Sequence, residues 1–129
     1  MSAKLLIFIT PCRQARGVES GDPSLSLSYP YIEAIVATGG IPWIGPLLVA
    51  ARDIAECVGR CDGILLTGGN DVQPSLYTES LPARLRRTVR PPDPQRDLME
   101  MELIRQALRQ GKLLLAICRG QHPGKQRPL

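Results

Sequence analysis

The chain has 129 residues, of which 43% are hydrophobic and 4% aromatic, and its formal net charge is +4. This length suits one globular domain, and no apolar stretch is long enough to span a membrane. Four cysteines without a CxxC pair, beside one histidine, argue against a zinc site and favour a reduced, cytoplasmic protein.

The first half of the chain predicts strands that alternate with helices. Apolar runs closed by proline or glycine indicate buried strands, and apolar residues at helical spacing indicate helices. Pro11 ends the first strand, Gly39 and Gly40 end the first helix, and the polar residues 13–28 predict a loop. In order, the predicted elements are a strand at 4–10, a helix at 29–38, a short strand at 42–44, a helix at 51–58 and a strand at 63–67.

The second half predicts a long loop, one long helix and a last strand. The loop covers residues 70–94 and contains several prolines, and a loop of that length usually has a function or is mobile. The helix begins at residue 93 or 94 and ends near Gly111, and the last strand covers 113–117. Helical spacing predicts one apolar stripe on the helix, made of Leu98, Met101, Ile104 and Leu108.

This alternation predicts an α/β fold with a doubly wound parallel sheet. In such sheets the functional site forms outside the carboxyl ends of the strands. Thr10, the pair Gly68 and Gly69, and Cys118 all follow predicted strands. We therefore expect these three segments to converge on one cleft.

Cys118 follows an apolar strand and precedes Arg119 and Gly120, the pattern of a nucleophile elbow. A thiol there would lie at the N-terminus of the next helix, which lowers its pKa and makes the thiolate available. The alternative is a buried core cysteine. Cys57 and Cys61 are interpreted as small apolar residues rather than as metal ligands.

Gly68 and Gly69 leave a predicted strand as a glycine-rich turn, which permits close approach of the backbone to a ligand. An ordinary turn is the alternative interpretation. Beside a cysteine elbow, however, backbone N–H groups of Gly69 and Arg119 are candidate oxyanion donors. Together with the Cys118 thiolate, these two donors are the minimum apparatus for acyl transfer.

Four ordered segments, at 31–42, 63–77, 93–100 and 116–120, resemble the γ-glutamyl-γ-aminobutyrate hydrolase family of class I glutamine amidotransferase-like enzymes. The resemblance covers residues 4 to about 120 and implies a flavodoxin-like fold. It implies that Cys118 attacks a small γ-glutamyl amide and forms a thioester, that Gly69 and Arg119 bind the oxyanion, and that no cofactor takes part.

Arg96, Asp97 and Glu100 match the helix-opening pattern of the same family. We assign them no catalytic step. Acidic residues in the first turns of a helix favour its dipole, and Arg96 can pair with Glu100 at helical spacing. These residues are therefore interpreted as electrostatic stabilisation of the helix N-terminus.

The chain departs from the family pattern after Gly120. Gln121 comes one position early, and Pro123 falls where the elbow helix should continue. We interpret residues 1–120 as the N-terminal portion of a hydrolase domain, incomplete at its C-terminus, and 121–129 as an unrelated basic tail. His122 lies too close to Cys118 in sequence to serve as its base. The expected consequences are little or no hydrolase activity, marginal stability and an exposed apolar edge at the last strand.

Two other functions remain open. A related amidotransferase would pass ammonia to a partner, although the segment after Gly69 favours a hydrolase. The positive charge is uneven, with five Lys/Arg against eight Asp/Glu in residues 1–83 and eleven against four in 84–129. A nucleic-acid-binding module is the weaker alternative, because no aromatic residues interleave the arginines at 84–90 and no reader motif is present. The group attached to the γ-glutamyl unit and the oligomeric state are not predicted.

Overall fold

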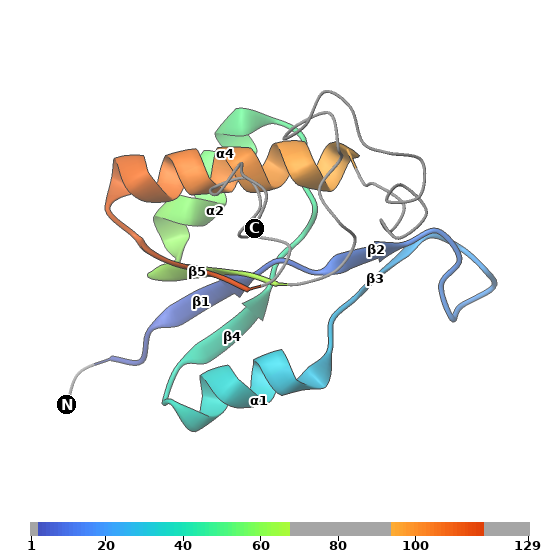
Figure 1. The fold of residues 1–129 in the computed structure, drawn as a ribbon, viewed down its shortest axis with the longest axis horizontal. Helices are drawn as coiled ribbons and strands as arrows, with labels where there is room; N and C mark the ends of the chain where they lie inside the picture. The colour runs from blue at the N-terminus through green and yellow to red at the C-terminus, as the bar shows by residue number, and fades with distance from the viewer. Residues whose placement is uncertain (1–2, 68–93, 118–129) are drawn as a thin grey trace, which may run out of the picture.

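The computed structural model describes residues 3–67 and 94–117. Its centre is a parallel four-stranded sheet with the strand order β4-β1-β5-β6 (Figure 1). The four strands are β1 (Leu6–Ile9), β4 (Ile41–Ile44), β5 (Gly63–Leu66) and β6 (Leu113–Ala116). Counting only these parallel strands in chain order, the sheet reads 2-1-3-4, which is the flavodoxin-like order. The predicted fold class is confirmed.

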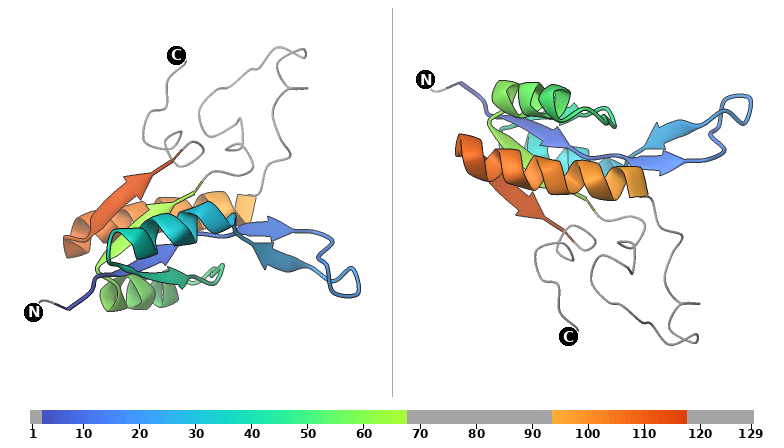
Figure 2. Two further views of the ribbon diagram at one scale, coloured as in Figure 1. Left: turned by 90° about the horizontal axis from the view of Figure 1, so that it is seen from below. Right: turned by 90° about the horizontal axis from the view of Figure 1, so that it is seen from above.

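Helices cover both faces of the sheet. Helix α1 (Tyr29–Ala37) lies on one face, and α2 (Ala51–Arg60) and α4 (Pro94–Gln110) lie together on the other (Figures 1 and 2). This arrangement follows from right-handed crossovers, because the chain moves outward from β1 in one direction through α1 and in the other through α2 and α4. Of the described helices, none has the length and apolar content that a bilayer crossing requires.

Residues 13–28 were predicted to be a loop, but they include most of a β-hairpin. Strand β2 (Cys12–Gln14) pairs antiparallel with β3 (Ser24–Ser26). Figure 1 shows this hairpin extending past the end of β1. The prediction failed because each strand has only three residues and β2 has no alternating apolar pattern, so the alternation of serine and leucine at 24–28 had no recognisable partner strand. Their backbone pairing is supplemented by the Gln14 amide, which donates to the Ser26 hydroxyl at 3.0 Å.

The hydrophobic core lies between the sheet and helices α2 and α4. Its largest aromatic member is Phe8 on β1, whose ring meets Trp43 edge-on with centroids 5.0 Å apart. Gly45 follows β4 directly, and a Cβ atom there would overlap the Phe8 ring. Glycine is therefore required at this position. The other fully buried core side chains include Ile54, Val58, Leu66, Met99 and Leu103.

Helix α4 buries a different face from the predicted one. Leu98 is 66% exposed and Leu108 is 75% exposed, and of the four residues of the predicted stripe only Ile104 packs against the core. The buried apolar residues are instead Met99, Leu103 and Ala107, at i, i+4 spacing. This true face was hard to recognise in the sequence, because Arg96 and Glu100 continue it toward the helix N-terminus with charged side chains.

The two neighbouring strands β5 and β6 differ in burial. All residues of β5 are buried, whereas Leu113, Leu114 and Leu115 of the edge strand β6 are exposed. An exposed apolar edge at the last strand was predicted, and the burial of the described residues confirms it. At the opposite edge of the sheet, β4 accommodates Pro42, as expected for an edge strand.

Candidate functional site

The predicted reactive residues lie outside the described part of the chain. Cys118, Arg119 and Gly69 are all in this group, as are the tail at 121–129 and all but the last residue of the predicted loop at 70–94. The residues that immediately precede two of these segments are described. Ile117 follows β6, and its backbone N–H donates to the carbonyl of Leu66 on β5 at 2.8 Å. The chain therefore leaves β5 and β6 at adjacent points of the same sheet edge.

Two buried threonines join the carboxyl ends of β1 and β5. Thr10 and Thr67 are both 0% exposed. The Thr67 hydroxyl donates to the Thr10 carbonyl at 2.6 Å, and the Thr67 N–H donates to the Thr10 hydroxyl oxygen at 3.1 Å. The predicted position of Thr10 at this edge is confirmed. The partnership with Thr67 was not predicted, although the carboxyl-end rule could have indicated it.

Arg96 reaches this edge from the first turn of α4 and is buried to 1% exposure. Its Nη2 donates to the Thr67 carbonyl at 3.2 Å and to the Thr67 hydroxyl at 3.1 Å. On the other side of the guanidinium, Nη1 donates to the Cys12 sulfur at 3.1 Å. Its Nε pairs with Glu100 Oε2 at 3.2 Å, and Glu100 is itself fully buried. Such pairing is what permits a charge to be buried at all.

The predicted pairing of Arg96 with Glu100 is confirmed, but its surroundings were not foreseen. Arg96 does not lie on the helix surface. It connects α4 to β1 and β5 through Thr10 and Thr67, and it pairs with Glu100 within α4. We call these four residues the buried cluster. Thr67 immediately precedes Gly68, so the cluster holds the backbone at the point where the predicted oxyanion turn begins. Its contacts indicate a positioning role.

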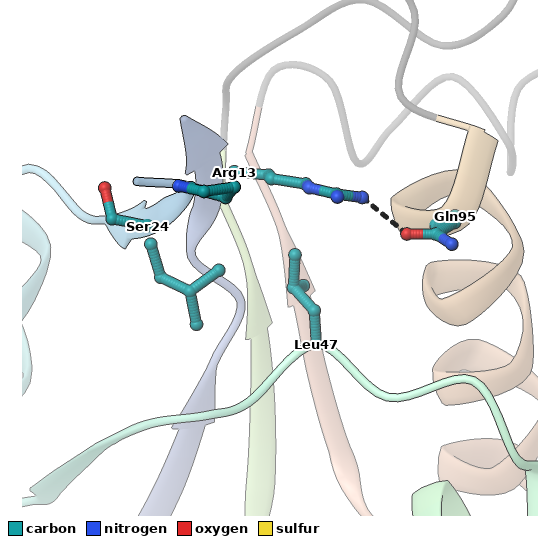
Figure 3. A pocket seen from close by; sticks show the side chains of 6 residues that line it. Arg13, Ser24, Leu47 and Gln95 are labelled. Carbon is teal, nitrogen blue, oxygen red and sulfur yellow. Dashed lines mark hydrogen bonds between the residues drawn. The ribbon is translucent and has the colours of Figure 1, made fainter. Parts of the chain in front are cut away.

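A small pocket lies beside the buried cluster at the same edge of the sheet (Figure 3). Its volume is about 240 Å³. The described residues that line it come from the hairpin, the segment after β4 and the first turn of α4, and they are Arg13, Pro23, Ser24, Leu25, Leu47 and Gln95. Arg13 Nη1 donates to Gln95 Oε1. Sequence reasoning missed this pocket because it treated residues 13–28 as a loop.

Cys57 and Cys61 have the character of apolar residues. Cys61 is 1% exposed within the core, where its thiol donates to the Val58 carbonyl at 3.4 Å. Burial raises the pKa of the Cys61 thiol, and also that of Cys57 on α2. A protonated thiol is a poor nucleophile. Within residues 3–67 and 94–117, no group of three or more His, Cys, Asp or Glu side chains is arranged to hold a metal ion.

Comparison with known proteins connects this geometry to a family. The Peptidase C26 family model matches residues 6–122. Gamma-glutamyl-gamma-aminobutyrate hydrolase PuuD of Escherichia coli (strain K12) is 35% identical over 117 residues, covering 89% of this chain and 42% of that protein. Protein NtpR of Enterococcus hirae is 33% identical over 90 residues, covering 70% of this chain and 36% of that protein.

The chain thus spans less than half the length of these relatives. The matched range nonetheless includes all the described strands and helices. It also includes both threonines and Arg96 of the buried cluster. The resemblance predicted from four short segments is confirmed, and the chain belongs to the Peptidase C26 family.

Proposed function

We propose that this chain carries the nucleophile of a γ-glutamyl hydrolase, with Cys118 as that nucleophile. The observation that carries the proposal is the parallel pairing of β5 with β6 up to the Leu66–Ile117 hydrogen bond, within a range matched by the family. Gly68 and Cys118 each follow the last described residue of their segment, Thr67 and Ile117. This edge is where doubly wound folds bind their ligands.

In the proposed reaction, the Cys118 thiolate attacks the γ-carbonyl carbon of a γ-glutamyl amide. A carbon–sulfur bond forms, and the carbonyl oxygen takes the negative charge as a tetrahedral oxyanion. Collapse of this intermediate breaks the carbon–nitrogen bond, and the amine leaves with an added proton. Water then cleaves the thioester, which releases glutamate and regenerates the thiol.

The backbone N–H groups of Gly69 and Arg119 are the proposed oxyanion donors. Preorganised donors of this kind contribute about 3–4 kcal/mol each to the stabilisation of a transition state. Their effect depends on a rigid approach to the site. The buried cluster supports that requirement, because Arg96 and Thr10 hold Thr67, two residues before Gly69.

The proposed substrate is a small γ-glutamyl amide whose amine part carries a carboxylate. Support comes from the name of the Escherichia coli relatives, gamma-glutamyl-gamma-aminobutyrate hydrolase. A cysteine nucleophile suits a reducing compartment such as the cytoplasm.

We also propose that residues 1–129 on their own hydrolyse this amide slowly or not at all. Their single histidine, His122, lies only four positions after Cys118. A general base must face the nucleophile across the cleft, and in this sequence we assign no residue to that role.

The test is to incubate the purified chain with γ-glutamyl-γ-aminobutyrate and to measure both free 4-aminobutyrate and covalent modification by intact-protein mass spectrometry. We expect a γ-glutamyl adduct on Cys118 and little turnover. The Cys118→Ser variant should lose the adduct, whereas the matched control Cys57→Ser should keep it, since Cys57 lies on α2. Adduct formation that persists in Cys118→Ser would contradict the proposal.

The same experiment separates the alternatives. Rapid Cys118-dependent turnover by the 129-residue chain would confirm the nucleophile and contradict the proposed inactivity. Ammonia release from glutamine, without cleavage of γ-glutamyl-γ-aminobutyrate, would indicate an amidotransferase instead. If neither an adduct nor hydrolysis is observed with any γ-glutamyl amide, the nucleophile assignment is overturned.

A further inference from the structure

We propose that the pocket beside the buried cluster is a carboxylate-binding site and that Arg13 is its anion-binding residue. This inference rests on the proposed function, because it assigns the pocket to a carboxylate of the γ-glutamyl amide substrate. The described residues that line the pocket are not among those proposed to carry the reaction. It would orient the substrate without touching the bond that breaks.

The placement of Arg13 suits this role. Its register partner across the hairpin is Leu25, and its guanidinium extends over the pocket toward Gln95 (Figure 3). A guanidinium has five N–H donors in a fork that fits a carboxylate, and Gln95 accepts from Nη1. Among the described residues, no carboxylate forms an ion pair with Arg13, and its side chain is solvent-exposed.

Two further features favour a small organic anion. The pocket borders the first turn of α4 at Gln95, where the helix dipole adds a positive potential. Apolar walls at Pro23, Leu25 and Leu47 suit a short methylene chain. The volume of about 240 Å³ lies below the range of roughly 300–1,000 Å³ typical of drug-sized ligands. These features together describe a site for one small carboxylic acid group and its methylenes.

A γ-glutamyl amide offers this chemistry from two sources. One is the α-carboxylate of the γ-glutamyl unit, and the other is a carboxylate on the amine that leaves. Three probes distinguish them. γ-Glutamyl-γ-aminobutyrate has both carboxylates, γ-glutamylpropylamide lacks the one on the leaving amine, and 4-aminobutanoyl-γ-aminobutyrate lacks the α-carboxylate.

The experiment measures binding of each probe by titration calorimetry, at low salt, to the full chain carrying Cys118→Ala, which removes turnover. Arg13→Gln is compared with Arg16→Gln, a matched loss of charge in the same exposed hairpin. Thermal unfolding of each variant verifies that it folds. We expect Arg13→Gln to weaken γ-glutamyl-γ-aminobutyrate about tenfold and Arg16→Gln to change its affinity less than about twofold.

The source of the carboxylate follows from the truncated probes. The probe that lacks the bound carboxylate should bind equally well to the Arg13→Gln variant and to its parent, whereas the other probe should remain sensitive. Equal affinity of the variant and the parent for γ-glutamyl-γ-aminobutyrate would overturn the inference while leaving the proposed function intact. Equal weakening of all three probes would also overturn it, because the effect would then be independent of any one carboxylate.

Binding of free 4-aminobutyrate tests the carboxylate site independently of the proposed function. If it binds in an Arg13-dependent manner while no γ-glutamyl amide binds, the carboxylate site stands and the proposed function fails. If no carboxylate probe binds at all, both proposals are overturned.

Discussion

Two arginines at the same edge of the sheet have opposite environments. Arg96 is 1% exposed, and its guanidinium contacts Glu100 and Thr67. Arg13 is exposed, and its guanidinium meets the neutral amide oxygen of Gln95. Gln95 and Arg96 are consecutive on α4, so one turn of helix directs one side chain to the pocket and the next into the protein.

The contrast shows that burial determines whether a charged side chain binds other parts of the protein or remains available to a ligand. A buried guanidinium must have its charge and its donors satisfied by the protein, which turns it into a cross-link between elements. An exposed guanidinium keeps donors that a ligand can use, at little cost in stability. Arg96 therefore belongs to the scaffold, and Arg13 to recognition. The predictions below test this division, beginning with the largest expected effect.

Removing one partner of the buried ion pair should destabilise the protein most. We expect Glu100→Leu to lower the free energy of unfolding by about 3–5 kcal/mol, because it leaves the Arg96 charge buried without its carboxylate. The double variant Arg96→Met/Glu100→Leu should be more stable than Glu100→Leu. Chemical denaturation measures both values.

The exposed pair Arg60–Glu56 is the control, since it has the same i, i+4 spacing at 3.0 Å but lies in solvent. Glu56→Leu should change the free energy of unfolding by about 0.5 kcal/mol or less. Similar losses for the buried and the exposed pair would show that burial does not distinguish them.

A smaller loss is expected from the threonine bridge. Thr67→Val should lower the free energy of unfolding by about 1–3 kcal/mol, because it removes the hydroxyl that donates to the Thr10 carbonyl and accepts from Arg96. Thr67→Ser keeps the hydroxyl and should recover most of the loss. If Thr67→Ser is as unstable as Thr67→Val, the methyl group that serine lacks contributes as much as the hydroxyl. Wild-type stability of Thr67→Val would contradict the role of the hydrogen bonds.

The buried thiol of Cys61 makes the stability of the fold depend on pH. Burial raises the pKa of Cys61 above its ordinary value of 9.0, so the unfolded chain releases this proton at a lower pH than the folded chain. The stabilising contribution is complete below pH 9.0 and declines as the pH rises through the folded-state pKa. Thermal unfolding between neutral and alkaline pH should therefore show a shallower decline for Cys61→Ala than for the wild type. Parallel declines would contradict this assignment.

The smallest effect on stability is expected at Arg13. Arg13→Gln should change the free energy of unfolding by no more than about 0.5 kcal/mol, because the side chain is exposed and donates a hydrogen bond to the neutral amide of Gln95. The same variant should lose carboxylate affinity. A loss of stability comparable to that of Glu100→Leu would place Arg13 in the scaffold and remove the contrast with Arg96.

Much of the fold was predictable because its signals are local. Short apolar runs, such as the one that Pro11 ends, predicted the parallel strands to within a few residues, and Gly39 and Gly40 predicted the end of α1. The alternation of strands with helices then predicted the doubly wound sheet. The pairing of Arg96 with Glu100 was also predictable, since helical spacing alone brings these side chains together.

The buried face of α4 was not predictable from its own sequence. Apolar residues recur at helical spacing both in the predicted stripe from Leu98 to Leu108 and in the buried row from Met99 to Ala107, so the pattern permits either face. The choice is made by packing against α2 and the sheet, where Arg96 also finds Thr10 and Thr67. Burial of Arg96 depends on Thr10 and Thr67 as well as on Glu100, and the two threonines are distant from it in sequence.

The sequence by itself determined the order of the helices and the parallel strands, the edge of the sheet at which a site should form, and the family. These depend on local patterns and short motifs. Only the tertiary structure decided that Arg96 is enclosed while Arg13 faces a pocket. Both are arginines near predicted strand or helix ends, and the difference between them arises from long-range contacts, which determine how much water each guanidinium retains.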